Sequence, residues 1–475
     1  MSKSPVTPQY VDVHMPPPSY EEVMGHQALS SVKADVPREE LPPLAYIDIM
    51  PRCLHPGNMR KKVPPEYDRF STLMGAANYW LRANLSYGVW KCETVERKVE
   101  NNGEIIMDKM ICHESTYGFN VLIRGLRLWL YVKDPSTPPQ QLGLLNKVPE
   151  TTQVNLTAGQ VYHPFTGFVI GHPLFLQMYG YSMTTYQGFR ETLHSLNEDL
   201  KKQPLQGSIL NVESATLKVS EGLEKAVIDS DNTVCHENGG KMKRYTQIIR
   251  VFYVIGEPAN ETIGMKEFIP SITKPPDIAT HAQFQNFEEI MTKFNKWLPH
   301  QTGIKLVNIQ LHEVRYTEKL GQLEILSDLT DDFDDGMSDR SFLQTLRVFY
   351  VTAPSTAPPQ QISFITSRLF LPVRTGERSF ESMSQTMFRI EAWLRVTGIP
   401  AYKVETVKFL YREPLKLGVD ATRTYYTAFK GVGKYYVTAV RVYFLNPYQE
   451  PHPCYLPPAF PWDPSMKPSS TCTIQ

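Results

Sequence analysis

The chain lacks the two kinds of hydrophobic segment that direct a protein into or across a membrane. Its first residues, Met1-Ser2-Lys3-Ser4-Pro5, carry no apolar core of a signal peptide, and no run of about 18 apolar residues occurs in its 475 residues. We therefore expect a cytoplasmic protein.

An excess of charge is also missing. Lys plus Arg and Asp plus Glu both number 49, so the formal net charge is +0 and no overall field attracts nucleic acid, which we do not expect as a partner. The six cysteines, at positions 53, 92, 112, 235, 454 and 472, lack the spacing of a disulfide framework, which agrees with a reducing compartment.

Catalytic motifs are absent as well. The chain contains no GxSxG elbow, no P-loop and no HExxH pair, so we expect no enzymatic activity. Its composition, 41% hydrophobic and 21% charged, is close to the globular average, and its length allows two or three hydrophobic cores.

What the chain does contain is an internal repeat with four copies. The copies align on FSTLMGAANYWL (70–81), FRETLHSLNEDL (189–200), FEEIMTKFNKWL (287–298) and MSQTMFRIEAWL (383–394). Apolar residues fall at helical spacing within each copy, and three copies have Asn at the ninth position where the fourth has Glu391. The spacing predicts four equivalent helices.

Two β-rich phrases follow each predicted helix. The first is CETV (92–95), VESA (212–215), IQLH (309–312) and VETV (404–407). The second is a closing strand, at 126–132, 249–255, 346–351 and 440–445, with Arg127, Arg250, Arg347 and Arg441 in register. Consensus residues of a repeat mostly pack one unit on the next, so we expect a structural role for these arginines.

With a β-like phrase before each helix, the working unit is β-α-β-β. We therefore predict an α+β fold, in which four such units form two tandem two-unit domains, 43–262 and 263–450. The Pro-rich tails, 1–42 and 451–475, are predicted to be disordered.

A zinc site is the alternative to a repeat region without a cofactor. Cys112-His113 and Cys235-His236 occupy the same place in the first two units and would form a Cys₂His₂ set if they converged. Adjacent Cys and His are poor ligand spacing in a strand, because neighbouring side chains point to opposite faces. We therefore expect no cofactor, with zinc as the alternative. The acidic segment 328–339 does not fit a calcium loop and is predicted to be a solvated loop between strands.

The N-terminal tail contains Pro17-Pro18-Ser19-Tyr20, a PPxY match. The prolines favour a polyproline II helix, whose proline faces fit the aromatic grooves of WW domains together with the Tyr20 ring. The segment resembles the PPxY tails of adaptors that recruit HECT-type ubiquitin ligases, and also the late-budding motifs of viral matrix proteins. A second match, Pro64-Pro65-Glu66-Tyr67, precedes the first helix, where proline also has a capping role.

The other end of the chain, Cys472-Thr473-Ile474-Gln475, fits a C-a-a-X box, in which Gln at the last position predicts farnesyl on Cys472. One farnesyl chain anchors weakly, and few basic residues lie nearby to help it.

Together these features predict a non-enzymatic adaptor. Its repeat body binds an unidentified partner, its PPxY recruits a WW-domain protein such as a HECT-type ubiquitin ligase, and its lipid holds it peripherally on cytosolic membrane faces. The alternatives are a protein that holds a small hydrophobic ligand or a metal in clefts between paired units, and a self-assembling structural protein.

Overall fold

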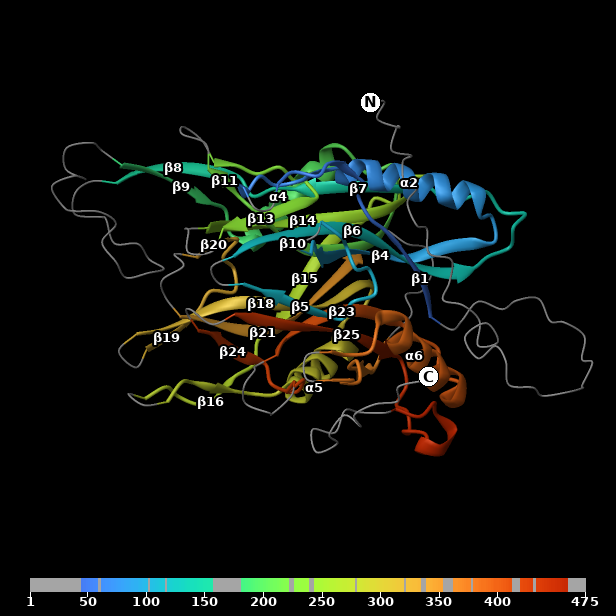
Figure 1. The fold of residues 1–475 in the computed structure, drawn as a ribbon. Helices are drawn as coiled ribbons and strands as arrows, with labels where there is room; N and C mark the ends of the chain where they lie inside the picture. Colours follow the sequence, from blue (N-terminus) through green and yellow to red (C-terminus); the bar gives the residue numbers. More distant parts are fainter. Residues whose placement is uncertain are drawn as a thin grey trace, which may run out of the picture.

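The computed structural model describes residues 44–58, 61–100, 103–115, 118–156, 181–221, 226–238, 243–277, 280–319, 322–334, 339–352, 362–376, 379–411, 419–429 and 433–459. Strands make up 48% of the structure, and the long ones are arranged in four small antiparallel sheets that resemble the blades of a four-bladed β-propeller (Figure 1).

Each sheet is built on one long central strand. In sheet one, β6 (Phe119–Val132) lies between β4 (Tyr87–Lys98) and the pair β1 (Ala45–Ile49) and β13 (Val234–Asn238). In sheet two, β14 (Lys243–Ile255) lies between β10 (Gly207–Lys218) and the pair β7 (Leu142–Lys147) and β20 (Asp331–Asp334). In sheet three, β21 (Arg340–Thr352) lies between β18 (Ile304–Lys319) and the pair β15 (Thr262–Phe268) and β24 (Tyr425–Ala428), with β19 (Gln322–Ile325) beyond β18. In sheet four, β25 (Lys434–Phe444) lies between β23 (Lys403–Tyr411) and the pair β22 (Thr366–Phe370) and β5 (Ile111–Glu114).

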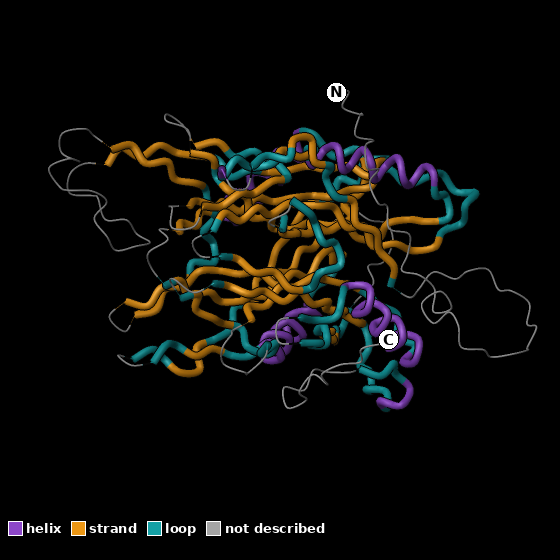
Figure 2. Tube along the Cα trace, in the orientation of Figure 1, coloured by secondary structure: helices purple, strands orange, loops and turns teal. Residues whose placement is uncertain are grey.

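Four short hairpins and the helices complete the body. The hairpins are β2 (Cys53–His55) with β3 (Glu66–Tyr67), β8 (Thr151–Leu156) with β9 (Tyr181–Tyr186), β11 (Ser220–Glu221) with β12 (Ala226–Val227), and β16 (Ile272–Lys274) with β17 (Gln283–Phe284). The helices are α2 (Phe70–Ala83), α4 (Phe189–Lys202), α5 (Phe287–Trp297) and α6 (Met383–Thr397), with 3₁₀ turns η2 (Leu298–His300) and η3 (Pro453–Tyr455). Figure 2 shows the helices on the outside of the strand layers.

The predicted α+β fold of β-α-β-β units was therefore wrong. The helices and the two β phrases occur where the repeat placed them, but the body is mostly β, and its sheets are not made from single units. Residues 1–43 and 460–475 lie outside the described residues, whereas η3 lies within the segment assigned to the C-terminal tail.

Each sheet takes one short strand from another unit. The second unit provides β13 to sheet one, the third provides β20 to sheet two, and the fourth provides β24 to sheet three. The first unit provides β5 to sheet four, where Cys112 pairs with Tyr436. The exchange therefore returns to its starting point and closes the four sheets into a ring.

The residues just before each exchanged strand also cap the helix of the unit that receives it. Asp231, ahead of β13, accepts hydrogen bonds from the backbone N–H groups of Phe70 (2.9 Å, at its carbonyl) and Ser71 (2.6 Å, at its carboxylate). Asp328 caps α4 in the same way, and Asp108 caps α6. An aspartate at a helix N-terminus satisfies unpaired N–H groups and the helix dipole, so each contact fastens one unit to the next.

Each helix packs between two neighbouring sheets. The core under α2, for example, contains Phe70 and Leu128 from the first unit and Phe252 from the second. The buried arginines lie at these boundaries, with Arg250 4.1 Å from the ring centre of Phe70 and Arg347 4.1 Å from that of Phe189. The expected structural role of the repeated phenylalanines and arginines is thus confirmed at the boundaries between units.

The ninth-position asparagines form a second link between units. Asn78 donates from Nδ2 to the carbonyl of Leu142 (2.9 Å) and accepts at Oδ1 from its N–H (2.7 Å). Asn197 makes the same pair of bonds with Ile263, and Asn295 makes them with Ile365. Each asparagine amide therefore satisfies one backbone N–H group and one backbone carbonyl near the start of the next unit's edge strand.

The fourth copy breaks this pattern at Glu391. The equivalent backbone position in the first unit is Leu44. Leu44 lies four residues before Asp48, the strand partner of Arg127, just as Leu142 lies four residues before Asn146, the strand partner of Arg250. A carboxylate accepts but cannot donate, and Oε1 of Glu391 is buried without a hydrogen-bond partner. Burial raises the pKa of Glu391 to about 7. The boundary between the fourth unit and the first therefore lacks the pair of hydrogen bonds that an asparagine makes at the other three boundaries.

Replacing Glu391 by Asn should stabilise the protein. The amide can make both backbone hydrogen bonds, which contribute about 1–3 kcal/mol to the free energy of unfolding. A carboxyl whose pKa is raised on folding costs stability above its unfolded pKa, so the advantage of E391N should be largest near pH 8 and shrink toward about pH 5.

Thermal unfolding of wild type, E391N and E391A across that pH range measures the effect. E391A removes the buried charge without adding an amide, so it should recover only the pH-dependent part. An E391N protein that is less stable than E391A at every pH would contradict the assignment.

Candidate functional site: the central cavity

A cavity of about 480 Å³ lies where the four sheets meet. All four exchanged strands contribute to its wall, with residues that include Glu114 from β5, Glu237 from β13, Asp332 from β20 and Tyr426 from β24. The cavity therefore exists because the ring is closed. A second chamber of about 300 Å³ shares part of its wall, including Glu96 and Arg124.

Side chains of the innermost strands bridge the sheets around this centre. Glu93 accepts from the backbone N–H of Thr406 (2.8 Å), and Glu213 accepts from the N–H of Thr94 (3.1 Å). Gln310 accepts in turn from Ser214 (3.0 Å), and Glu405 accepts from Leu311. These four bonds occur at one level of the repeat, the phrase that the sequence shows as CETV, VESA, IQLH and VETV. They join β4, β10, β18 and β23 in a closed circuit.

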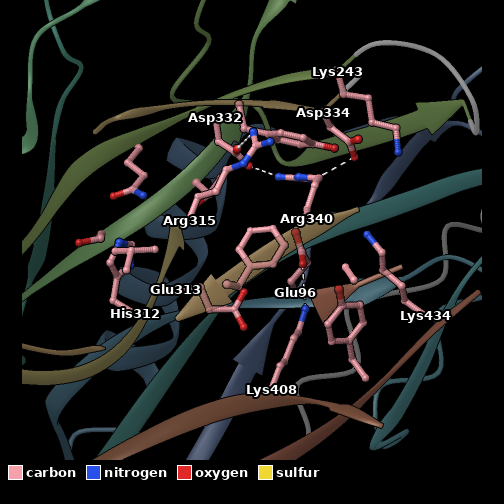
Figure 3. Close-up of a pocket in the computed structure, with 18 of the residues that line it drawn as sticks. Glu96, Lys243, His312, Glu313, Arg315, Asp332, Asp334, Arg340, Lys408 and Lys434 are labelled. Atoms are coloured by element: carbon pink, nitrogen blue, oxygen red, sulfur yellow. Dashed lines mark hydrogen bonds and ion pairs between the residues drawn. The ribbon is translucent and has the colours of Figure 1, made fainter. Parts of the chain in front are cut away.

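The cavity wall is rich in ion pairs. In Figure 3, Arg340 lies between Asp332 and Asp334 and donates to both, at 2.9 Å in the case of Asp334. On the opposite side, Lys408 donates to Glu96 at 2.8 Å. Burial alone would raise the pKa of Glu96, but Lys408 and Arg124 together lower it below its usual value.

Two carboxyl groups of the wall have raised pKa values instead. Burial and the nearby charge of Glu237 raise the pKa of Glu114 to about 7, although Lys408 and Lys434 act in the opposite direction. Burial also raises the pKa of Glu313, against the effect of hydrogen bonds from Tyr426 and Gln344. Shifts of this kind gather at binding and catalytic sites.

The wall also presents polar atoms that have no hydrogen-bond partner. His312 is 6% exposed and its Nε2 is unpartnered, while Thr246 is fully buried and its Oγ1 is unpartnered. Burial, followed by the charge of Arg347, lowers the pKa of His312 well below its usual value, so its ring is neutral at physiological pH. Buried polar groups are nearly always satisfied, which makes these atoms candidates for contact with a bound molecule.

The predicted Cys-His pairs lie on two different sheets. Cys112 and His113 belong to β5 in sheet four, and Cys235 and His236 belong to β13 in sheet one. The His113 ring stacks on Tyr435 at 4.3 Å between centres, and Cys235 is buried against the cavity.

Burial raises the pKa of Cys112 to about 11 and that of Cys235 to about 12, so both are neutral thiols at physiological pH. Among the described residues, no group of three or more His, Cys, Asp or Glu side chains is arranged to hold a metal ion.

The two PPxY matches have different positions. Pro17, Pro18 and Tyr20 lie outside the described residues, as does Cys472. Pro65 is buried, and Tyr67 is 7% exposed and packs with Val99, Val121 and Ile123. A WW domain could reach Tyr67 only if this part of the body opened.

Sequence reasoning missed most of the cavity wall. The acidic segment predicted as a solvated loop contains β20, and its aspartates bind arginines, such as Asp331 with Arg244 at 2.6 Å. The alignment of this segment with the three other exchanged segments was a usable signal for a strand. Four residues hold the same position in the repeat: Cys112, Cys235, Asp332 and Tyr426.

No family model, no curated protein and no solved structure matches the chain. None of the helices in the described ranges is long and apolar enough to cross a membrane.

Proposed function

We propose that the protein is a non-enzymatic adaptor, with a closed ring as its body and Pro17-Pro18-Ser19-Tyr20 as the ligand for a WW-domain protein. The observation that carries this proposal is the burial of the second PPxY match. Tyr67 is one of the buried residues of a core and cannot present its ring, so Pro17-Pro18-Ser19-Tyr20 is the remaining candidate. A proline-rich ligand must present its rings to the groove of its partner, so the N-terminal copy is the one that binds.

The architecture of the body supports the same proposal. Strand exchange ties every unit to its neighbour, and asparagine bonds reinforce three of the four boundaries, so the ring is suited to hold a bound partner in a fixed orientation. The partner we propose for Tyr20 is a HECT-type ubiquitin ligase, which would act on whatever the ring holds. This interaction places the adaptor in the cytoplasm.

A lipid on Cys472 would bring the adaptor to membranes. Protein farnesyltransferase recognises the C-a-a-X box only at a free carboxyl end. The intact mass of the protein from eukaryotic cells therefore tests whether Gln475 is the last residue made and whether Cys472 is farnesylated. We expect the mass of a farnesylated chain that ends at Cys472, and a chain that retains unmodified Gln475 would remove this part of the proposal.

Replacing Tyr20 by Ala should weaken the binding of a WW-domain protein to the full chain by about ten-fold or more, because the ring fills the aromatic groove. Binding to an array of WW domains from HECT-type ligases measures the effect.

Two matched variants test the assignment. Tyr67→Phe alters the buried motif, and Tyr79→Ala removes a tyrosine that is 71% exposed but belongs to no PPxY motif. Both should bind as wild type does. Equal binding by Y20A and wild type, or a loss confined to Y67F, would contradict the proposal.

The alternative function, a ligand held between repeat units, would use the central cavity. That alternative was a small hydrophobic ligand or a metal in clefts between paired units, whereas the central cavity is lined largely by charged and polar side chains. This observation favours a polar ligand.

A further inference from the structure

The cationic side chains on the cavity wall are already paired with acidic ones. Its cationic side chains are engaged by acids: Lys243 by Glu237 at 2.8 Å, Lys408 by Glu96, and Arg340 by two aspartates. Lys434 lies opposite Glu114 in the ladder of β5 and β25. An anion entering the cavity would have to break ion pairs that already exist.

Acidic groups, in contrast, gather around one aromatic ring. Burial and then the charges of Glu114 and Glu313 raise the pKa of the Tyr436 hydroxyl well above its usual value, and Glu237 acts in the same direction. These three carboxyl groups come from β5, β18 and β13, in three different units, and all three line the cavity. A buried carboxyl with a raised pKa takes up a proton when no other cation is present.

The wall also supplies groups that suit an organic cation. Tyr426 and Tyr436 line the cavity beside Phe342, whose ring stacks on Tyr426 at 5.2 Å between centres. Aromatic faces attract ammonium groups. The unpartnered Nε2 of the neutral His312 adds a hydrogen-bonding atom that no side chain satisfies.

We propose that the central cavity binds a small organic cation with a primary ammonium group, held between the carboxyl groups of Glu114 and Glu313 against the rings of Tyr426 and Tyr436. A bare metal ion fits less well, because no three acidic or histidine side chains among the described residues are grouped for coordination. The same ammonium chemistry occurs in a free diamine and in the lysine side chain of a protein partner.

The probe is 1,4-diaminobutane, added to the full chain in a titration calorimeter at pH 6, 7 and 8. Glu114 faces Glu96, Glu237, Lys408 and Lys434, and its pKa of about 7 means that the cation must displace a proton. We expect heat that depends on the buffer's ionisation enthalpy at pH 7, and an affinity about ten-fold higher at pH 8 than at pH 6.

Glu114→Gln should lower the affinity about ten-fold and remove most of its pH dependence, since the amide resembles the protonated acid and cannot ionise. Glu198→Gln, on the exposed side of α4, is the matched control and should bind as wild type does. If E114Q does not fold, proton release by the wild-type protein still decides the question.

Two further arms identify the source of the ammonium group. Nα-acetyl-lysine methylamide represents a lysine side chain, and its binding in preference to the diamine would assign the site to a protein partner. 1,4-Butanediol has a similar length without charge, and succinate has a similar length with the opposite charge. Neither should bind. Binding of succinate, binding of Mg²⁺ or Ca²⁺ in place of the amines, or amine binding without proton release would overturn the proposal.

Discussion

The pairing of each short exchanged strand with a neighbour's central strand is the interaction on which the rest of the structure depends. Each of these strands has only four or five residues, as in β5 (Ile111–Glu114) and β13 (Val234–Asn238). A ladder this short is weak alone, but aspartate caps such as Asp231 hold the preceding segment on the helix that the same sheet carries. Because the fourth sheet receives its strand from the first unit, the first and fourth units are joined in the same way as the other neighbours.

Closure also explains why charge is buried at the centre. The exchanged strands bring polar side chains from four units to the wall of one cavity. Many of these groups satisfy each other, as Lys408 and Glu96 do, whereas Nε2 of His312 has no hydrogen-bond partner and Glu114 and Glu313 have raised pKa values.

The parts of this fold that depend on local sequence could be predicted. Helical spacing gave α2, α4, α5 and α6, and β-rich phrases gave the eight long strands, because both signals lie within a dozen residues. The fold class could not be predicted, since it depends on which strand pairs with which, and partners such as Cys112 and Tyr436 are more than 300 positions apart. Asp332 and Asp334 misled the prediction for a physical reason. Aspartate is disfavoured in strands, and here it is paired with Arg315 and Arg340 from strands of another sheet.

A cross-link between the first and fourth units tests the closed ring most directly. Strand partners in an antiparallel ladder lie about 4.5–5.5 Å apart, within the range of a disulfide, so Tyr436→Cys should form a bond with Cys112 on mild oxidation. Leu122→Cys, opposite Cys235, tests the link between the first two units in the same way. We predict that peptide mapping finds both bonds, each in its own variant and within one chain. A protein that forms the 122–235 bond but not the 112–436 bond would have an open arrangement of sheets, and the central cavity would lose its basis.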